Sequence, residues 1–180
     1  MIHSGEIIRI MACFAGVGKT TLAEQCPEMF IDLVCMPYKY YLTESGEEFI
    51  QSEAEASKAN FDNIMQEDWP DNYVEAIKKA MCDDKIILIP SAWDVLARLR
   101  EENIPYYLCY PQRDAKEIYR MRYISRGNSE DFLYIFIDGW DRFMDALEGD
   151  TYGCHVILQP HQFLADVVNE HILILDNYRN

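Results

Sequence analysis

A short segment near the N-terminus has the residue types and spacing to bind phosphate. Residues 13–21 read Cys-Phe-Ala-Gly-Val-Gly-Lys-Thr-Thr, and Gly16 and Gly18 permit backbone angles and a close approach that a side chain would block. Phosphate oxygens need several converging N–H donors, which such a loop supplies together with the start of a following helix. Lys19 can reach the outer phosphates of a nucleoside triphosphate, and the Thr20 hydroxyl can bind Mg²⁺.

The first position of this segment departs from the usual pattern G-x-x-x-x-G-K-[ST], because Cys13 stands where the first glycine is expected. The surroundings still fit the pattern, since an apolar run at 6–14 predicts a strand before the loop and 19–26 predicts a helix after it. A chance G-x-G-K-T in an ordinary loop is the alternative. We expect ATP, with Mg²⁺, to bind against residues Ala15, Gly16, Val17, Gly18, Lys19, Thr20 and Thr21.

A second chemical feature is a cluster of arginines within 111–128 of a chain that is otherwise acidic. On a helix, Arg113 and Arg120 share one face, and Arg122 and Arg126 share another. Planar guanidinium groups suit a migrating phosphoryl group. We therefore predict that this segment is a lid whose arginines close on the nucleotide and exclude water. A solvated helix face with local ion pairs is the alternative.

A single carboxylate, Asp32, lies inside the apolar run 29–36, which predicts a second strand. A carboxylate near the end of a strand in an open parallel sheet lies where ligands bind. Asp32 can position or deprotonate an acceptor hydroxyl there. A salt bridge to Lys19 or Lys39, or a capping role, would account for it equally well.

These side chains must be positioned by a fold, and the rest of the chain predicts which one. Short apolar runs alternate with helical patterns, with no linker and no repeat of fixed period. This order predicts a parallel sheet with helices on both faces, that is, a three-layer α/β fold in a single domain, 1–180. We expect further strands at 85–90, 104–110 and 154–158, and further helices at 70–81, 94–102, 113–126, 129–147 and 162–169. The tail 171–176 is either an extra strand or a docking segment.

Composition limits the partners and the compartment. The 180 residues carry a formal net charge of -15, so we expect neither a nucleic acid nor a membrane as the main partner. The six cysteines show no metal-ligand spacing and the four histidines are scattered, which indicates free thiols in a reducing cytoplasm and no histidine metal site. Because no segment has the pattern of a signal peptide or the length of a membrane span, we expect a cytoplasmic protein.

Two absences narrow the class of nucleotide-binding protein. Motor and transport ATPases carry an acid at the end of a strand to hold Mg²⁺, but the third expected strand here ends in Ile-Pro-Ser. GTP-binding switches recognise guanine through the sequence Asn-Lys-x-Asp, which does not occur in this chain. With the loop at 13–21, Asp32, the Tyr-Pro-Gln-Arg turn at 110–113 and the Arg-Gly pair at 126–127, most of the chain resembles the P-loop nucleotide kinase superfamily. The nearest resemblance is to small adenylate kinase-like proteins of bacteriophages and Gram-positive bacteria.

This resemblance implies a five-stranded parallel sheet with the loop strand in the middle, the P-loop kinase fold. It also implies that Asp32 contacts the acceptor or a metal-bound water, so that Thr20 and Asp32 are the expected metal residues. The region 37–81 would bind the acceptor, where stacked aromatic rings would suit a base, although ordinary packing explains any single one. Its aromatic residues are Tyr38, Tyr40, Tyr41, Trp69 and Tyr73, and Ser91 and Trp93 should face the same edge.

The sequence therefore predicts a kinase that moves the γ-phosphate of Mg-ATP to a small acceptor, most readily a nucleoside or deoxynucleoside monophosphate. The expected catalytic residues are Lys19, Asp32, Arg113, Arg120, Arg122 and Arg126. Two alternatives stay open. One is a kinase of another small metabolite with a hydroxyl acceptor, in which Asp32 is the base. The other is a nucleotide-binding regulatory protein with little catalysis.

Overall fold

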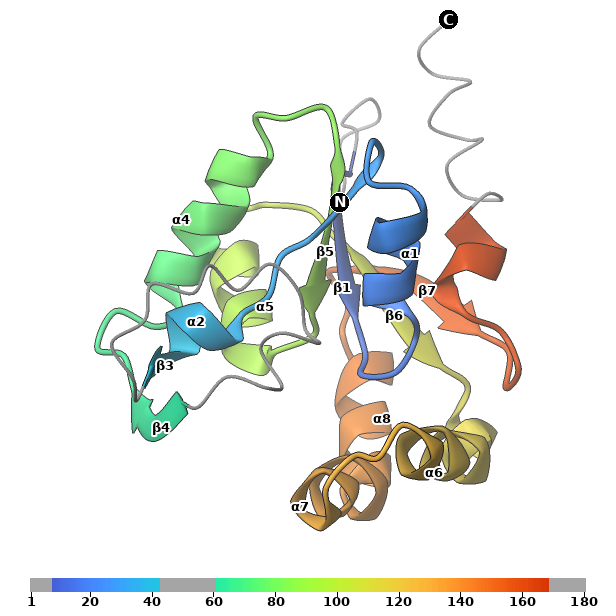
Figure 1. The fold of residues 1–180 in the computed structure, drawn as a ribbon. Coiled ribbons are helices and arrows are strands. Elements are labelled where there is room, and N and C mark those ends of the chain that lie inside the picture. Colours follow the sequence, from blue (N-terminus) through green and yellow to red (C-terminus); the bar gives the residue numbers. More distant parts are fainter. Residues whose placement is uncertain (1–7, 43–60, 169–180) are drawn as a thin grey trace, which may run out of the picture.

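The centre of the molecule is a sheet of five parallel strands (Figure 1). The computed structural model describes residues 8–42 and 61–168. The strands lie in the order β2-β5-β1-β6-β7. Their bounds are β1 Ile10–Cys13, β2 Phe30–Asp32, β5 Ile86–Pro90, β6 Tyr107–Pro111 and β7 Cys154–Leu158.

The strands form where the sequence has short continuous apolar runs, as expected for strands buried on both faces. All four residues of β1 are buried, and so are the central residues of β5 and β6. In the register of the sheet, Cys13 at the end of β1 lies opposite Pro90 of β5 and Cys109 of β6. The carboxyl ends of the three central strands therefore meet at one edge.

Helices cover both faces of the sheet, which makes the α/β prediction correct (Figure 1). Helix α1, Lys19–Gln25, leads from β1 to the edge strand β2 and lies on one face. Helices α4, Asp71–Ala80, and α5, Trp93–Glu101, lie together on the other face. Right-handed crossovers require this division. The chain moves from β1 to the edge strand β2 in one direction across the sheet, and from β2 to β5 and from β5 to β6 in the opposite direction, so the helices of the two directions lie on opposite faces.

The helical segments between β6 and β7 form a separate aromatic layer near the end of β1. After the 3₁₀ turn Arg113–Ala115 come α6, Lys116–Ser125, α7, Glu130–Leu133, and α8, Trp140–Glu148. The ring of Phe14 packs edge-on against Phe136, Trp140 and Phe143, with ring centroids 5.6 to 5.7 Å apart. This packing holds the helical layer against the loop that follows β1.

The expected helix at 129–147 is not continuous. Ser129 caps its start, as its Oγ accepts a hydrogen bond from the Phe132 N–H at 3.2 Å. A π-helical segment, Tyr134–Asp138, then separates α7 from α8. A Cβ at Gly139 would collide with the carbonyl oxygen of Ile135, so this glycine admits the wide turn.

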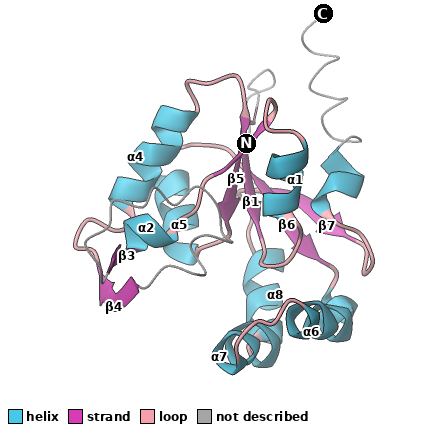
Figure 2. Ribbon diagram, in the orientation of Figure 1, coloured by secondary structure: helices cyan, strands magenta, loops and turns pink. Residues whose placement is uncertain are grey.

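The strand predicted at 29–36 is present but shorter than expected. Only Phe30–Asp32 is a strand, and Pro37 lies in the first turn of a short helix, α2, Met36–Lys39. Proline lacks the N–H that a strand interior needs but suits the first helical turn. The chain then forms β3, Tyr40–Leu42, and β4, Phe61–Met65, an antiparallel pair apart from the main sheet (Figure 2).

The last expected helix is present at 164–168 in the part that the structure describes, and the tail 171–176 lies outside it. Among the described residues, no helix combines the length and the apolar character needed to cross a bilayer.

Candidate functional site

The loop between β1 and α1 has the backbone conformation that its glycines predict. Gly16 and Gly18 have φ angles of +81° and +99°, in the left-handed region where only glycine is unstrained. Lys19 is the first residue of α1, and only 4% of its surface is exposed. The loop therefore turns sharply and directs a buried lysine into the site.

The departure at Cys13 has a structural explanation. Cys13 is the last residue of β1 and pairs in register with both neighbouring strands. Its backbone is not in the left-handed region, so this position needs no glycine. The buried thiol donates a weak hydrogen bond to the carbonyl oxygen of Met11 at 3.3 Å.

Thr20 and Asp32, the two residues predicted to act at the metal, lie within hydrogen-bonding distance of each other. The Thr20 hydroxyl donates a hydrogen bond to Asp32 Oδ2 at 2.7 Å. The end of β2 brings Asp32 to the same sheet edge as the loop, as expected for an open parallel sheet. Within 8–42 and 61–168, no group of three or more His, Cys, Asp or Glu side chains could hold a metal ion by itself.

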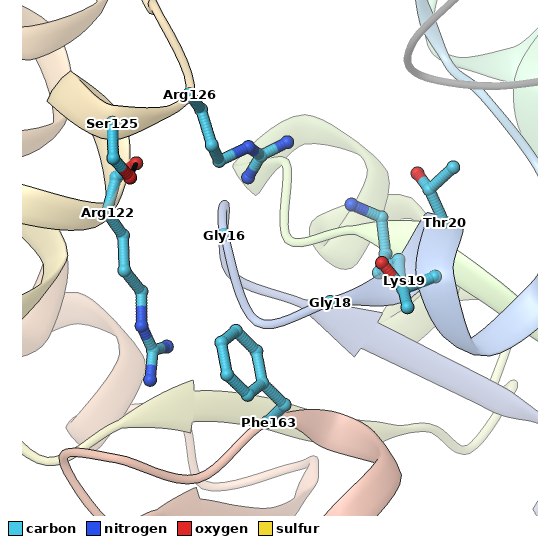
Figure 3. A pocket seen from close by; sticks show the side chains of 9 residues that line it. Gly16, Gly18, Lys19, Thr20, Arg122, Ser125, Arg126 and Phe163 are labelled. Atoms are coloured by element: carbon cyan, nitrogen blue, oxygen red, sulfur yellow. Dashed lines mark hydrogen bonds between the residues drawn. The ribbon is translucent and has the colours of Figure 1, made fainter.

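A cavity of about 350 Å³ opens between the loop and helix α6 (Figure 3). Arg122 and Arg126 both line it, and the Arg126 side chain extends from the end of α6 toward the loop. The Arg122 guanidinium lies 4.0 Å from the centre of the Phe163 ring. It also donates from Nη2 to the carbonyl oxygens of Pro160 and Gln162, at 3.1 and 3.3 Å.

The structure does not bring the other two predicted arginines to this cavity. The guanidinium of Arg113 binds Asp145 at 2.6 Å and Glu148 at 2.8 Å. The pKa of Arg113 is raised, most by its hydrogen bond to Glu148 and next by its hydrogen bond to Asp145. Arg120 pairs with Glu117 at 3.2 Å, one turn away on the same helix.

The arginine segment predicted as a lid is anchored to the core in this structure. Tyr119 and Tyr123 of α6 are fully buried. The Tyr123 hydroxyl donates to the carbonyl oxygen of Ala15 in the loop at 2.8 Å. Burial raises the pKa of Tyr119 to about 12, against the opposing effect of the nearby Arg122 charge. The contacts tie α6 directly to the glycine loop between β1 and α1.

A second cavity, of about 440 Å³, lies on the other side of Lys19, which lines both cavities. Its walls include the predicted residues Ser91 and Trp93, together with Lys39 and Asp94. Three phenylalanines complete an aromatic wall, one each from α7, the π-helical segment and α8, and they are Phe132, Phe136 and Phe143.

Sequence reasoning did not identify these phenylalanines or Phe163. Phe163 follows the carboxyl end of β7, and position at that sheet edge is the one signal that would have suggested it. Conversely, Trp69 and Tyr73 pack as core residues, with rings stacked at 5.7 Å and the Tyr73 hydroxyl donating to the Leu33 carbonyl oxygen. Of the predicted aromatic residues, only Trp93 lines the second cavity.

Comparison of the chain with protein-family models, with curated proteins and with solved structures gave no match.

Proposed function

We propose that this protein is a P-loop kinase, a phosphotransferase that binds Mg-ATP in the first cavity and transfers its γ-phosphoryl group to a small acceptor in the second. The observation that carries the proposal is the position of Lys19. This buried lysine follows the two left-handed glycines and lines both cavities. A cation between donor and acceptor is what stabilises a phosphoryl group in transit.

The first cavity has the groups that a nucleoside triphosphate needs. The loop from Gly16 offers its backbone N–H groups to phosphate oxygens, and Arg126 adds a guanidinium from the facing helix. The ring of Phe163, with Arg122 held over it, offers an apolar surface for a base.

The donor set at Thr20 and Asp32 fits Mg²⁺. This ion keeps several waters and takes one or two protein ligands beside the substrate phosphates, so the lack of a larger ligand group among the described residues agrees with it. The Thr20 hydroxyl would hold the ion, and Asp32, bonded to that hydroxyl, would hold its water. The ion would neutralise charge on the phosphates.

The order of the strands supports the same class. β1, which runs into the loop, lies in the middle of the sheet between β5 and β6. The resemblance to nucleotide kinases implies this arrangement, and in an open parallel sheet ligands bind beyond the carboxyl ends of the central strands.

The test is equilibrium binding of Mg-ATP by calorimetry, followed by release of ADP with a panel of acceptors. Lys19→Ala should weaken binding at least about tenfold, because a charge-assisted contact to phosphate is removed. Lys79→Ala is the matched control, since Lys79 is exposed on α4, away from both cavities. Equal affinity of the two variants would contradict the proposal.

Binding without any acceptor-dependent ADP release would instead favour the alternative of a nucleotide-binding regulatory protein. Acceptor-dependent release that is lost in Lys19→Ala would establish the phosphotransferase.

A further inference from the structure

The second cavity has an aromatic wall built from stacked rings. The rings of Trp93 and Phe143 lie 5.6 Å apart with an interplanar angle of 15°, and those of Phe136 and Phe143 lie 5.3 Å apart at 13°. Phe132 continues the row, 4.5 Å from Phe136. Flat apolar walls of this kind favour a planar ring, and a volume of about 440 Å³ lies in the range of small-molecule sites.

The charges of this cavity are few and nearly balanced. Its charged lining residues are Lys19, Lys39 and Asp94. Lys19 also lines the first cavity. The Lys39 ammonium lies 5.3 Å from the centre of the Trp69 ring. None of the arginines that the structure describes lines it. A phosphomonoester is normally held by bidentate hydrogen bonds from arginines, and the described lining of this cavity has no arginine to make them.

Of the described part of the region 37–81, which was predicted to bind the acceptor, only Lys39 lines this cavity. Arg113, one of the four arginines that the sequence predicts to hold phosphate, is paired with Asp145 and Glu148 instead.

Resting on the proposed phosphotransferase function, we infer that the acceptor is an uncharged planar heterocycle with a free hydroxyl group, such as a nucleoside, and not a nucleoside monophosphate. The hydroxyl oxygen forms a bond to the γ-phosphorus of ATP. The bond from that phosphorus to the β–γ bridging oxygen breaks, and ADP leaves with the electron pair. The hydroxyl proton passes to the carboxylate of Asp94, which lines the cavity and accepts a hydrogen bond from the Trp69 indole. Asp32, the base expected from the sequence for a hydroxyl acceptor, is bonded to Thr20 and is not among the residues that line this cavity.

The experiment compares nucleosides with their own 5′-monophosphates. Binding of each ribo- and deoxynucleoside and its monophosphate is measured by saturation-transfer NMR and calorimetry on the full chain, without ATP. At least one nucleoside should bind at least about tenfold more tightly than its monophosphate, since the phosphate has no arginine partner here. With Mg-ATP present, the same nucleoside should yield ADP and a nucleoside monophosphate.

Trp93→Ala supplies the variant, because Trp93 stacks in the wall yet is 42% exposed, so its removal should not prevent folding. The variant should bind the nucleoside about tenfold more weakly, the effect of losing a stacking ring. Tyr134→Ala is the control, since Tyr134 is another exposed aromatic residue, which lines neither cavity.

Three outcomes overturn the inference: monophosphates that bind as tightly as nucleosides, nucleosides that do not bind, or equal affinity in Trp93→Ala and Tyr134→Ala. If Mg-ATP binds normally, such an outcome overturns the acceptor class alone. Failure of Mg-ATP to bind contradicts the phosphotransferase proposal itself, and the inference falls with it.

Discussion

At the scale of single residues, Gly16 is constrained twice. Its φ of +81° is unfavourable for any residue with a Cβ, and that Cβ would lie 2.7 Å from Cε1 of Tyr123. Gly16→Ala should therefore lower the free energy of unfolding by about 2–4 kcal/mol and also weaken Mg-ATP binding, because the loop must shift. Urea denaturation and an ATP titration measure the two effects.

Gly127→Ala is the control for this substitution. Gly127 has a similar φ of +74°, but a Cβ there would meet nothing within 4 Å. This variant should lose only the backbone contribution, about 1–2 kcal/mol. A Gly16 variant as stable as the Gly127 variant would mean that the contact with Tyr123 imposes no constraint.

At the scale of elements, the Tyr123 hydroxyl of helix α6 donates a hydrogen bond to the Ala15 carbonyl oxygen of the glycine loop. Tyr123→Phe keeps the buried ring and removes this hydrogen bond, so the free energy of unfolding should fall by about 1 kcal/mol. The proposed binding of Mg-ATP should weaken as well, because Arg122 lies on the same helix and Arg126 directly follows it. Chemical denaturation and calorimetry provide the measurements.

Tyr119→Phe is a matched control on the same helix. The Tyr119 hydroxyl is buried near Arg122 but makes no well-formed hydrogen bond among the described residues. Its removal should leave stability unchanged or slightly higher, since an unsatisfied buried hydroxyl is costly. Equal losses in both tyrosine variants would rule out a specific role for the bond to Ala15.

The elements also show what the sequence could predict. Continuous apolar runs predicted all five strands of the main sheet, and the glycine loop was placed correctly between β1 and α1. The antiparallel pair β3–β4 was missed because its residues are polar and aromatic without a clear alternation. The π-helical segment was missed because its hydrogen bonds span only one residue more than those of an α-helix, a difference that apolar spacing does not resolve.

The part of the site that is built from residues close together in the sequence was predictable, and the part built from distant residues was not. The loop at 13–21 was recognisable from the spacing of its own glycines, lysine and threonines. The ion pairs of Arg113 join residues 32 and 35 positions apart, and no local pattern indicates them. The aromatic wall of the second cavity likewise joins α5 to the helical layer before β7.

At the scale of the whole molecule, Asp150 joins three parts of the fold. Its side chain is 4% exposed, and it accepts hydrogen bonds from Arg100 at the end of α5, from Tyr106 before β6, and from the backbone N–H groups of Tyr152 and Gly153. Burial opposes ionisation, but these partners outweigh it and lower the pKa of Asp150 below its ordinary value of 3.8.

A lowered pKa stabilises the folded state above the unfolded pKa, and this stability is lost as pH falls through the folded value. Asp150→Asn should therefore cost about 1.5–3 kcal/mol at neutral pH, and the difference from the parent should shrink below about pH 4. Urea denaturation at several pH values measures it. Asp84→Asn, at an exposed ion pair with Arg9, should cost little throughout. A pH-independent difference for Asp150→Asn would exclude ionisation as the cause.

The exposure of Trp93 gives the second cavity an optical signal of its own. The protein has three tryptophans; Trp69 and Trp140 are 9% and 0% exposed, whereas Trp93 is 42% exposed and faces the cavity. A cationic quencher dissolved in water, such as the caesium ion, therefore reaches the indole of Trp93 and spares the other two. Any molecule that fills the cavity shields this indole, so the fluorescence of the unlabelled protein reports its occupancy.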